Sequence, residues 1–283
     1  MSENENKPTI DEIEEVLDDG EPIEVDIRDV AARYMELESG SMYVWGRRRS
    51  GKTHMVKWML YSLTQMGLEF DLVLLFSGTT CKDQFPMISR SFQYEGWNNE
   101  SAQVIDRLIA RQREILAHNA ECTEESEKRK LGRCLVILDD VLGSDGQLWQ
   151  GKKAGTLSSL FFQGRHHSID VWLLTQTMSG FRRVMSNSDL LVSWRSNSAE
   201  QRKEIRVAHC TCEEGGGVEV GRRAESFLER SWKGKHGASV IDLAGSHSKH
   251  SLKEYVFSCT CPEDDVPTFG VGPETHWTVG NDV

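Results

Sequence analysis

The chain lacks a long apolar run, an excess of basic residues and an even number of cysteines. None of its 283 residues belongs to a stretch approaching the roughly 20 apolar residues that cross a bilayer, and its first residues do not resemble a signal peptide. The seven cysteines are an odd number, and Cys134 lies in an apolar run, so a secreted disulfide framework is not indicated. With fewer basic than acidic residues, the chain also lacks the balance of a stand-alone nucleic-acid binder. We therefore expect a soluble, intracellular protein with reduced thiols.

The net charge of -11 is concentrated at the start of the chain. Residues 1–26 contain eleven acidic residues and one lysine, and the remainder is close to neutral. This acidic segment has no aromatic residue and cannot bury enough apolar surface to offset its ordering entropy, so we predict a disordered tail. It is either a solvated tail, which we favour, or a docking peptide. We expect one large domain over residues 27–265 and a polar C-terminal tail over 266–283.

Apolar runs that suit buried parallel strands alternate with amphipathic segments along the chain. Five runs predict strands: residues 41–45, 70–76, 134–138, 170–175 and 190–194. Between and beyond them we expect helices at 54–66, 103–117, 156–163, 199–208 and 222–232, and further strands at 238–243 and 254–261. This alternation predicts an α/β fold with a mostly parallel central sheet flanked by helices, extended by antiparallel C-terminal edge strands.

A phosphate-binding motif directly follows the first of these strands. Its eight residues are Gly46, Arg47, Arg48, Arg49, Ser50, Gly51, Lys52 and Thr53. A glycine-relaxed backbone can direct successive N–H groups at a β-phosphate, while Lys52 reaches the β and γ oxygens and Thr53 ligates Mg²⁺. The following helix presents its positive N-terminal end to the same phosphates. We expect this loop to bind ATP together with Mg²⁺, although three consecutive arginines make it unusually cationic.

Two carboxylates and an amide follow two of the other strands. Asp139 ends an apolar run 87 positions after Lys52, where a P-loop enzyme places the acid that holds Mg²⁺ through water. The adjacent Asp140 is then placed to orient or deprotonate an attacking water. Gln176 ends the next strand and is a candidate to sense the γ-phosphate. Alternatively, the acidic pair only caps a strand and begins a turn.

Taken in order, four blocks resemble the viral DNA-packaging ATPases of the FtsK and HerA superfamily. The resemblance is to the poxvirus-like branch, found in membrane-containing double-stranded DNA viruses. The blocks are the phosphate loop, residues 134–140, residues 164–168 (Gly-Arg-His-His-Ser) and the strand ending in Gln176. A Gly-Arg-His segment before the glutamine-bearing strand separates this family from most other P-loop classes. The resemblance covers residues 41–194 and leaves the last third of the chain unmatched.

The resemblance implies an additional-strand, RecA/FtsK-like P-loop fold, with the glutamine-bearing strand between the phosphate-loop strand and the Asp-Asp strand. It also implies a homo-oligomeric ring in which a neighbour's arginine reaches the transferring phosphoryl group. Arg165 is the first candidate for that arginine; Arg182, Arg183 and Arg195 are the reserves. The implied activity is ATP hydrolysis that translocates double-stranded DNA, without sequence preference, into a capsid. The implied partners are a capsid or virion membrane protein, at the site of virus assembly inside the host cell.

Three other functions stay open. A DNA-transfer ATPase of a cell or plasmid would share the chemistry. A small-molecule P-loop kinase needs no water-activating acid, so Asp140 and Gln176 count against it. A nucleotide-binding switch with little turnover is favoured only if the acid pair is inert.

Several remaining residues carry weaker hypotheses. Surface cations that could contact DNA occur in pairs: Lys152 with Lys153, Arg182 with Arg183, and Lys233 with Lys235. Cys210, Cys212, Cys259 and Cys261 could bind zinc, but one-residue spacing is unusual for such sites, and the last two alternate as packing residues on a strand. Trp45 and Trp172 lie inside apolar strands and are expected in the core.

Overall fold

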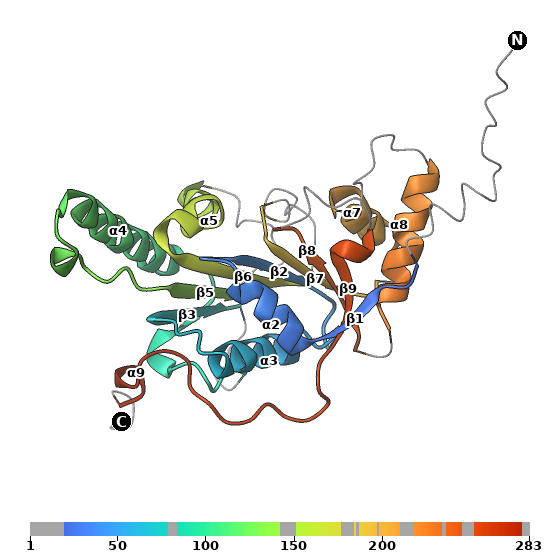
Figure 1. The fold of residues 1–283 in the computed structure, drawn as a ribbon, viewed down its shortest axis with the longest axis horizontal. Helices are drawn as coiled ribbons and strands as arrows, with labels where there is room; N and C mark the ends of the chain where they lie inside the picture. Colours follow the sequence, from blue (N-terminus) through green and yellow to red (C-terminus); the bar gives the residue numbers. More distant parts are fainter. Residues whose placement is uncertain are drawn as a thin grey trace, which may run out of the picture.

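One sheet organises the described part of the chain, as the computed structural model shows (Figure 1). The structure describes residues 20–78, 84–141, 151–176, 184, 187–196, 198–209, 218–233, 236–244 and 252–278. Within them, nine strands pair in the order β1-β9-β8-β7-β2-β6-β5-β3-β4. Their bounds are β1 Ile23–Asp26, β2 Ser41–Trp45, β3 Leu72–Ser77, β4 Gln93–Glu95, β5 Cys134–Asp139, β6 Ile169–Thr175, β7 Leu190–Trp194, β8 Ala238–Asp242 and β9 Val256–Thr260.

The strand directions confirm the predicted mostly parallel sheet. β7, β2, β6, β5, β3 and β4 run parallel to one another, and β6 lies between β2 and β5 as the resemblance implied. β8 is antiparallel to both β7 and β9, which confirms antiparallel strands at the C-terminal side. β9 is not the edge, however, because β1 pairs with it in parallel.

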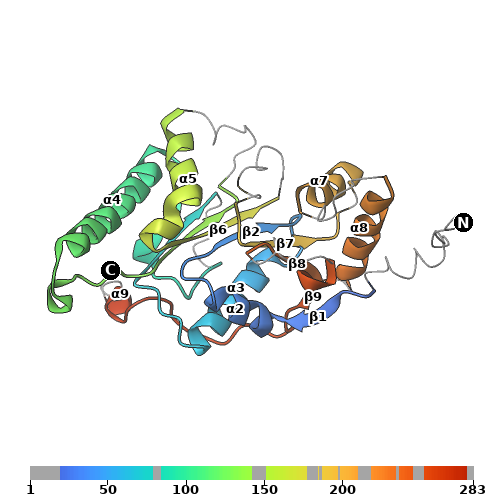
Figure 2. The same ribbon diagram turned by 45° about the horizontal axis from the view of Figure 1, so that its top comes forward.

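Helices cover both faces of the sheet (Figures 1 and 2). α2 (Ile27–Met35) and α3 (Lys52–Gln65) pack together on one face. The other face carries α4 (Asn99–Glu121), α5 (Gly151–Gln163), α7 (Ala199–His209) and α8 (Val218–Ser231). Short helical segments complete the chain: η1 Arg90–Phe92, η2 Glu125–Glu127, η4 Gly164–His167, η6 Leu252–Glu254 and α9 Thr275–Thr278. Among the described helices, none combines the length and apolar character needed to span a membrane.

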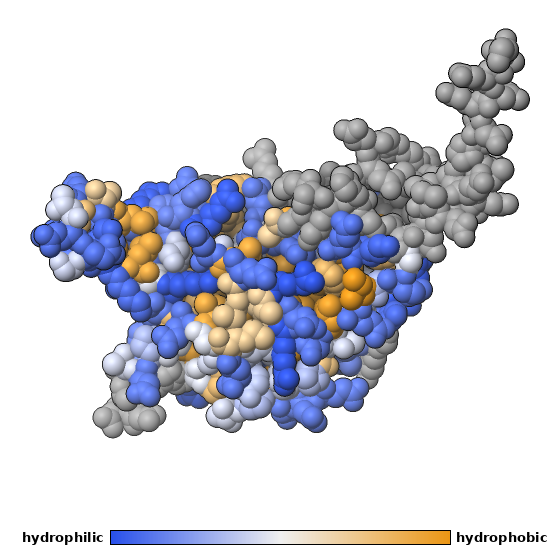
Figure 3. Space-filling model, in the orientation of Figure 1, coloured by the Kyte–Doolittle hydropathy of each residue, from blue (hydrophilic) through white to orange (hydrophobic). Residues whose placement is uncertain are grey.

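The side-chain alternation of the strands divides the interior into two cores. In β2, Met42 and Val44 pack in the core on the side of α2 and α3, whereas Tyr43 and Trp45 pack in the core on the side of α4, α5, α7 and α8. All five residues of β2 are buried, because helices cover both faces of this parallel strand. This double burial explains why β2 reads as a continuous apolar run. The surface in the view of Figure 3 is mostly hydrophilic, with hydrophobic residues in separate patches.

The two ends of the described chain are more ordered than the sequence predicts. Residues 23–26, which we expected in the acidic tail, form β1, and Asp26 caps α2 in a capping box with Asp29. The acidic tail stays a prediction for residues 1–19, which lie outside the described part. At the other end, Val271 is buried in the expected polar tail, and its N–H donates to the Met87 carbonyl at 2.9 Å.

A buried acid ties β6 to its surroundings at the amino end of the sheet. Asp170 is fully buried and accepts hydrogen bonds from Tyr34 Oη at 2.7 Å and from Arg133 Nη2 at 2.8 Å. Ser39 Oγ and the Gly40 N–H also donate to it. Burial raises the pKa of Asp170 despite these donors. β6, which leads to Gln176, is thus anchored at the end opposite to that residue.

We expect Asp170→Ala to be strongly destabilising. The substitution leaves the partly buried Arg133 guanidinium without its acid, and such a loss costs about 3–5 kcal/mol of the free energy of unfolding. Urea denaturation followed by circular dichroism measures this free energy. Lys130→Ala is the control, because it removes only an exposed ion pair with Asp71 and should change little. A loss below about 1 kcal/mol in Asp170→Ala would show that the network is not a structural anchor.

Candidate nucleotide-binding and catalytic site

The phosphate-loop residues form a compact turn between β2 and α3. The Gly46 N–H donates to the Thr175 carbonyl at 3.1 Å, which joins the loop to β6, and the Ser50 N–H donates to the Arg47 carbonyl at 3.1 Å. Gly51 has φ +111°, a conformation open to glycine and strained for other residues. A side chain at Gly46 would overlap Ser50 Oγ and the Trp194 ring. Gly51 is therefore favoured by its backbone conformation, and Gly46 by the little space that the Ser50 and Trp194 side chains leave.

The interior of the loop is suited to an anion. The Lys52 ammonium is largely buried and donates to the Gly46 and Arg47 carbonyls at 2.6 and 3.2 Å. Burial lowers the pKa of Lys52, while the Asp140 and Asp139 carboxylates oppose this shift. Ser50 Oγ is buried without a hydrogen-bond partner among the described residues. A buried cation and an unpaired hydroxyl beside a helix N-terminus fit a phosphate group.

Asp139 lies at the carboxyl end of β5, two strands from the phosphate loop. It is 4% exposed, and burial raises its pKa to about 6, with a further contribution from Asp140 and an opposing one from Lys52. A carboxylate and a hydroxyl are ligands that Mg²⁺ prefers. Asp139 and Thr53 thus have side chains of the kind that can hold that ion.

The structure brings together Asp140 and Gln176, which the sequence identified as separate candidates. The Gln176 side-chain amide donates to Asp140 Oδ2, and the Asp140 N–H donates to the Leu174 carbonyl at 3.0 Å. Asp140 has φ +45°, which is unusual for a residue other than glycine and turns the chain sharply after β5. Gly78 lies against this turn, where an added Cβ would overlap the Asp140 carbonyl oxygen. The acid is held by contacts from β3 and β6.

The arginine candidates occupy different edges of the sheet. Arg165 is exposed in η4, which precedes β6, whereas the phosphate loop follows the carboxyl end of the parallel strand β2. β6 has seven residues and spans about 23 Å at about 3.3 Å each, so one chain does not bring Arg165 to its own Lys52. Arg195 is exposed directly after β7, at the same edge as the phosphate loop. Arg182 and Arg183 lie outside the described residues.

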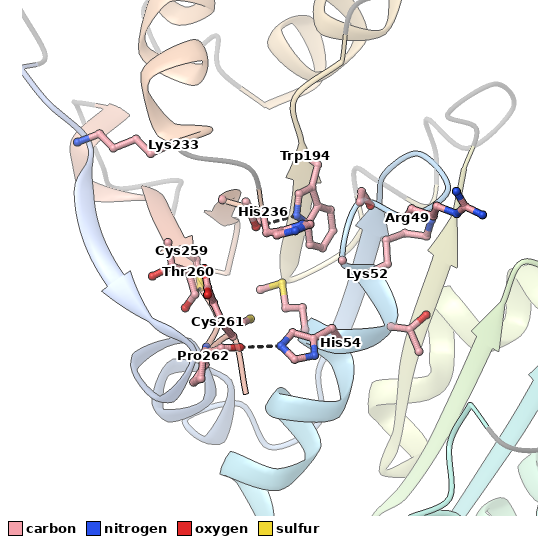
Figure 4. A pocket seen from close by; sticks show the side chains of 17 residues that line it. Arg49, Lys52, His54, Trp194, Lys233, His236, Cys259, Thr260, Cys261 and Pro262 are labelled. Atoms are coloured by element: carbon pink, nitrogen blue, oxygen red, sulfur yellow. Dashed lines mark hydrogen bonds between the residues drawn. The ribbon is translucent and has the colours of Figure 1, made fainter. Parts of the chain in front are cut away.

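A pocket of about 750 Å³ adjoins the phosphate loop on its β7 side (Figure 4). One wall comes from the loop and the start of α3; the others come from the ends of β7 and β9 and from the segment before β8. His54, Trp194, His236 and Pro262 are lining residues that the sequence did not identify as functional. The only usable signal was the position of Trp194 at the end of a predicted strand, since the last third of the chain contains no recognised motif.

The weaker candidates are only partly placed by the structure. No group of three or more potential metal-ligating side chains occurs among the described residues, but Cys210 and Cys212 lie outside them. Cys259 is buried in β9, as expected for a packing residue. Lys233 is paired with Glu24 at 2.8 Å. The side chains of Lys152 and Lys153, and all of Lys235, lie outside the described part, whereas Trp45 and Trp172 are in the core as predicted.

Comparison by sequence finds no matching family model and no matching curated protein. Comparison of structures finds the genome packaging NTPase B204 of Sulfolobus turreted icosahedral virus 2 with ATP-gammaS, with a TM-score of 0.50 and 11% identity, covering 79% of this chain and 98% of that one. The complex of the same NTPase with AMP gives a TM-score of 0.51. The cytoplasmic domain of the Type VII secretion ATPase EccC of Thermomonospora curvata gives 0.53 and 16% identity, covering 84% of this chain and 29% of that one.

Fold and motifs together define the chain as having a P-loop NTPase fold, as the sequence predicted. Within that class, it is similar in fold to a viral genome-packaging NTPase and to a secretion ATPase, which agrees with the resemblance to the FtsK and HerA superfamily.

We expect Gly78→Ala to lower the free energy of unfolding by about 1–3 kcal/mol, because the new methyl group overlaps the Asp140 carbonyl. Gly155→Ala is a matched control in α5, where open space surrounds the position and alanine favours the helix by up to about 1 kcal/mol. Guanidinium denaturation of both variants measures the difference. Equal stability of the two would show that the chain beside Asp140 is not tightly packed.

Proposed function

We propose that the chain is an ATPase motor that works as a homo-oligomeric ring and drives double-stranded DNA into a viral capsid. One observation carries the proposal: the contact between Asp140 and Gln176 beside a phosphate loop, on the flank of β2 where a γ-phosphate would lie. Similarity of fold to a genome packaging NTPase supports the packaging role.

The phosphate loop supplies binding and charge neutralisation. Its backbone N–H groups and the Lys52 ammonium would replace water around the β- and γ-phosphates. Bound Mg²⁺, held by Thr53 and through water by Asp139, would neutralise charge that develops on the phosphate oxygens. The raised pKa of Asp139 reflects burial, and the charge of the ion would favour its carboxylate form.

Asp140 and Gln176 would act on the attacking water. The side-chain amide of Gln176 donates a hydrogen bond to Asp140 Oδ2. Asp140 Oδ1 is then left to accept a proton or a hydrogen bond from the water. The carbonyl oxygen of the Gln176 amide remains as a second acceptor for orienting it. A kinase that transfers phosphate to a small molecule needs no such pair for water, so hydrolysis is the better fit.

The remaining parts of the proposal concern the assembly of subunits and the binding of DNA and of a virion protein. Arg165 would serve a neighbouring subunit, because it is exposed at the edge opposite to its own site. Double-stranded DNA would be gripped by a few cations through backbone contacts without sequence preference. A capsid or virion membrane protein would receive the motor at the site of virus assembly in the host cell. A DNA-transfer ATPase of a cell or plasmid is the second candidate, since a secretion ATPase shares the fold.

We expect Asp140→Asn to lower the rate of ATP hydrolysis by about 10²–10⁴-fold, because the amide cannot accept the proton of the attacking water. ATP affinity should stay close to that of the unaltered protein. Phosphate release with and without double-stranded DNA, together with equilibrium dialysis of labelled ATP, measures both quantities. DNA should stimulate the unaltered protein.

Lys52→Ala is the control, because it should lose ATP binding itself. Turnover that is indifferent to both DNA and Asp140 would overturn the motor and favour a kinase or a switch.

We expect Arg165→Ala and Lys52→Ala to complement each other in mixed oligomers. Each variant alone should be inactive, whereas a mixture places an intact phosphate loop beside an intact Arg165. Phosphate release across a series of mixing ratios should pass through a maximum. Arg195→Ala tests the reserve candidate in the same way. If Arg165→Ala retains full activity alone, Arg165 has no role in the reaction.

A further inference from the structure

The turn that carries Arg165 is held on several sides. η4 follows α5 directly, leads into β6, and packs against α4, α5 and β6. A Cβ on Gly164 would lie 2.8 Å from the Ile169 carbonyl oxygen, so the start of the turn lies too close to β6 for a side chain. Ser168 ends the turn with φ +54°, and its N–H donates to the Arg165 carbonyl at 3.4 Å. The backbone of Arg165 is therefore fixed, while its side chain is exposed.

A hydrogen-bond network with α4, which lies beside α5 (Figure 2), completes this support. Arg113 of α4 donates from Nε to His167 Nε2 at 3.1 Å and from Nη2 to Gln163 Oε1 at 2.7 Å. His167 Nδ1 lies 2.8 Å from the Gln163 main-chain carbonyl oxygen. One guanidinium thus binds the residue two positions before Arg165 and the residue two positions after it.

These contacts define one protonation state of His167. Nε2 accepts from Arg113, and because a carbonyl only accepts, Nδ1 carries the hydrogen that points to Gln163. The ring is therefore neutral. Burial lowers the pKa of His167, the hydrogen bond to Gln163 opposes this shift, and the charge of Arg113 adds to it. A neutral ring accepts a hydrogen bond from the guanidinium, whereas a protonated ring would repel it.

The helix that provides Arg113 is itself anchored to the sheet at this level. The neighbouring Gln112 is 2% exposed, and its side-chain amide donates to the Gly132 carbonyl at 2.7 Å, just before β5. A continuous path of buried and partly buried contacts therefore leads from the start of β5 through α4 to the turn. The Arg165 side chain has no hydrogen bond or ion pair with any described residue, so it is the member of this path that is left for a neighbour.

We propose that Arg113 and His167 are positioning residues, which hold the turn so that Arg165 reaches the transferring phosphoryl group in a neighbouring subunit. The inference rests on the proposed function, in which Arg165 acts in trans. Arginine has a long, flexible side chain, so its guanidinium is placed accurately only when the backbone beneath it is fixed. A displacement of about 1 Å in an active site can cost about 10²-fold in rate, which gives such support a measurable value.

We expect Arg113→Ala to lower the kcat of ATP hydrolysis about 10-fold to 100-fold, because the turn loses its contact with α4. ATP affinity should stay within about twofold, since the phosphate loop of the same subunit is untouched. Phosphate release and equilibrium dialysis of labelled ATP measure the two quantities. Arg107→Ala is the matched control on α4, where Arg107 Nε donates to the Gln103 carbonyl of its own helix, and it should leave kcat unchanged.

Two substitutions of His167 separate hydrogen bonding from packing. His167→Phe keeps a ring in the same place but removes the acceptor for Arg113, so kcat should fall as in Arg113→Ala. His167→Gln offers a carbonyl oxygen to Arg113 and should keep kcat within about threefold of the unaltered protein. Circular dichroism checks that each variant is folded. Full activity of His167→Phe, or an equal loss in both variants, would show that this hydrogen bond does not position the turn.

Mixed oligomers show on which side of the subunit interface Arg113 acts. Arg113→Ala has an intact phosphate loop, so mixing it with Lys52→Ala should restore phosphate release, whereas mixing it with Arg165→Ala should not. A variant that is only destabilised would not distinguish the two partners. Restoration by Arg165→Ala rather than by Lys52→Ala would place Arg113 at the site of its own subunit and overturn the inference.

The outcomes for Arg165→Ala separate this inference from the proposed function. If Arg165→Ala is inactive while Arg113→Ala and His167→Phe keep full kcat, only the positioning role is refuted. If Arg165→Ala is fully active, the proposed role of Arg165 fails, and the positioning role fails with it.

Discussion

β2 hydrogen-bonds to β6 on one side and β7 on the other, all three in parallel. Because the carboxyl ends of parallel strands meet at one edge, the segments after these strands converge: the phosphate loop after β2, Gln176 after β6 and Trp194 at the end of β7. β5 adds Asp139 and Asp140 to the same edge. Ligand sites of open α/β sheets form at this edge for the same reason.

This arrangement concentrates ionisable groups in a poorly solvated place. Lys52 and Asp139 are both buried. Burial lowers the pKa of Lys52 and raises that of Asp139, and each shift favours the neutral form of the group. Such groups are stabilised as ions by a phosphate and a metal ion more than by the protein alone. The amino end of the sheet differs from this edge. There the network around Asp170 anchors β6, and the charged groups Asp170 and Arg133 already pair with each other.

The sequence predicted the central elements because helices bury both faces of these strands. β2 has the predicted bounds, and β5, β6 and β7 agree within a residue. β1 was missed because an edge strand shows little alternation: three of its four residues are exposed, and Glu24 gives it the composition of a solvated tail. β4 was missed because a strand of three residues, two of them partly exposed and one exposed, carries too little apolar pattern.

The sequence by itself determined the position of the phosphate loop and of the acid pair, because these depend on local residue types and spacing, and the resemblance implied that β6 lies between β2 and β5. It identified Asp140 and Gln176 as separate candidates, and their hydrogen bond is visible only in the structure. Only the tertiary structure decided that Arg165 lies at the far edge and that His54 meets Pro262 across 208 positions. Pairings between distant segments leave no periodic trace in either one, so the pocket walls from the last third of the chain emerge only when the sheet is assembled.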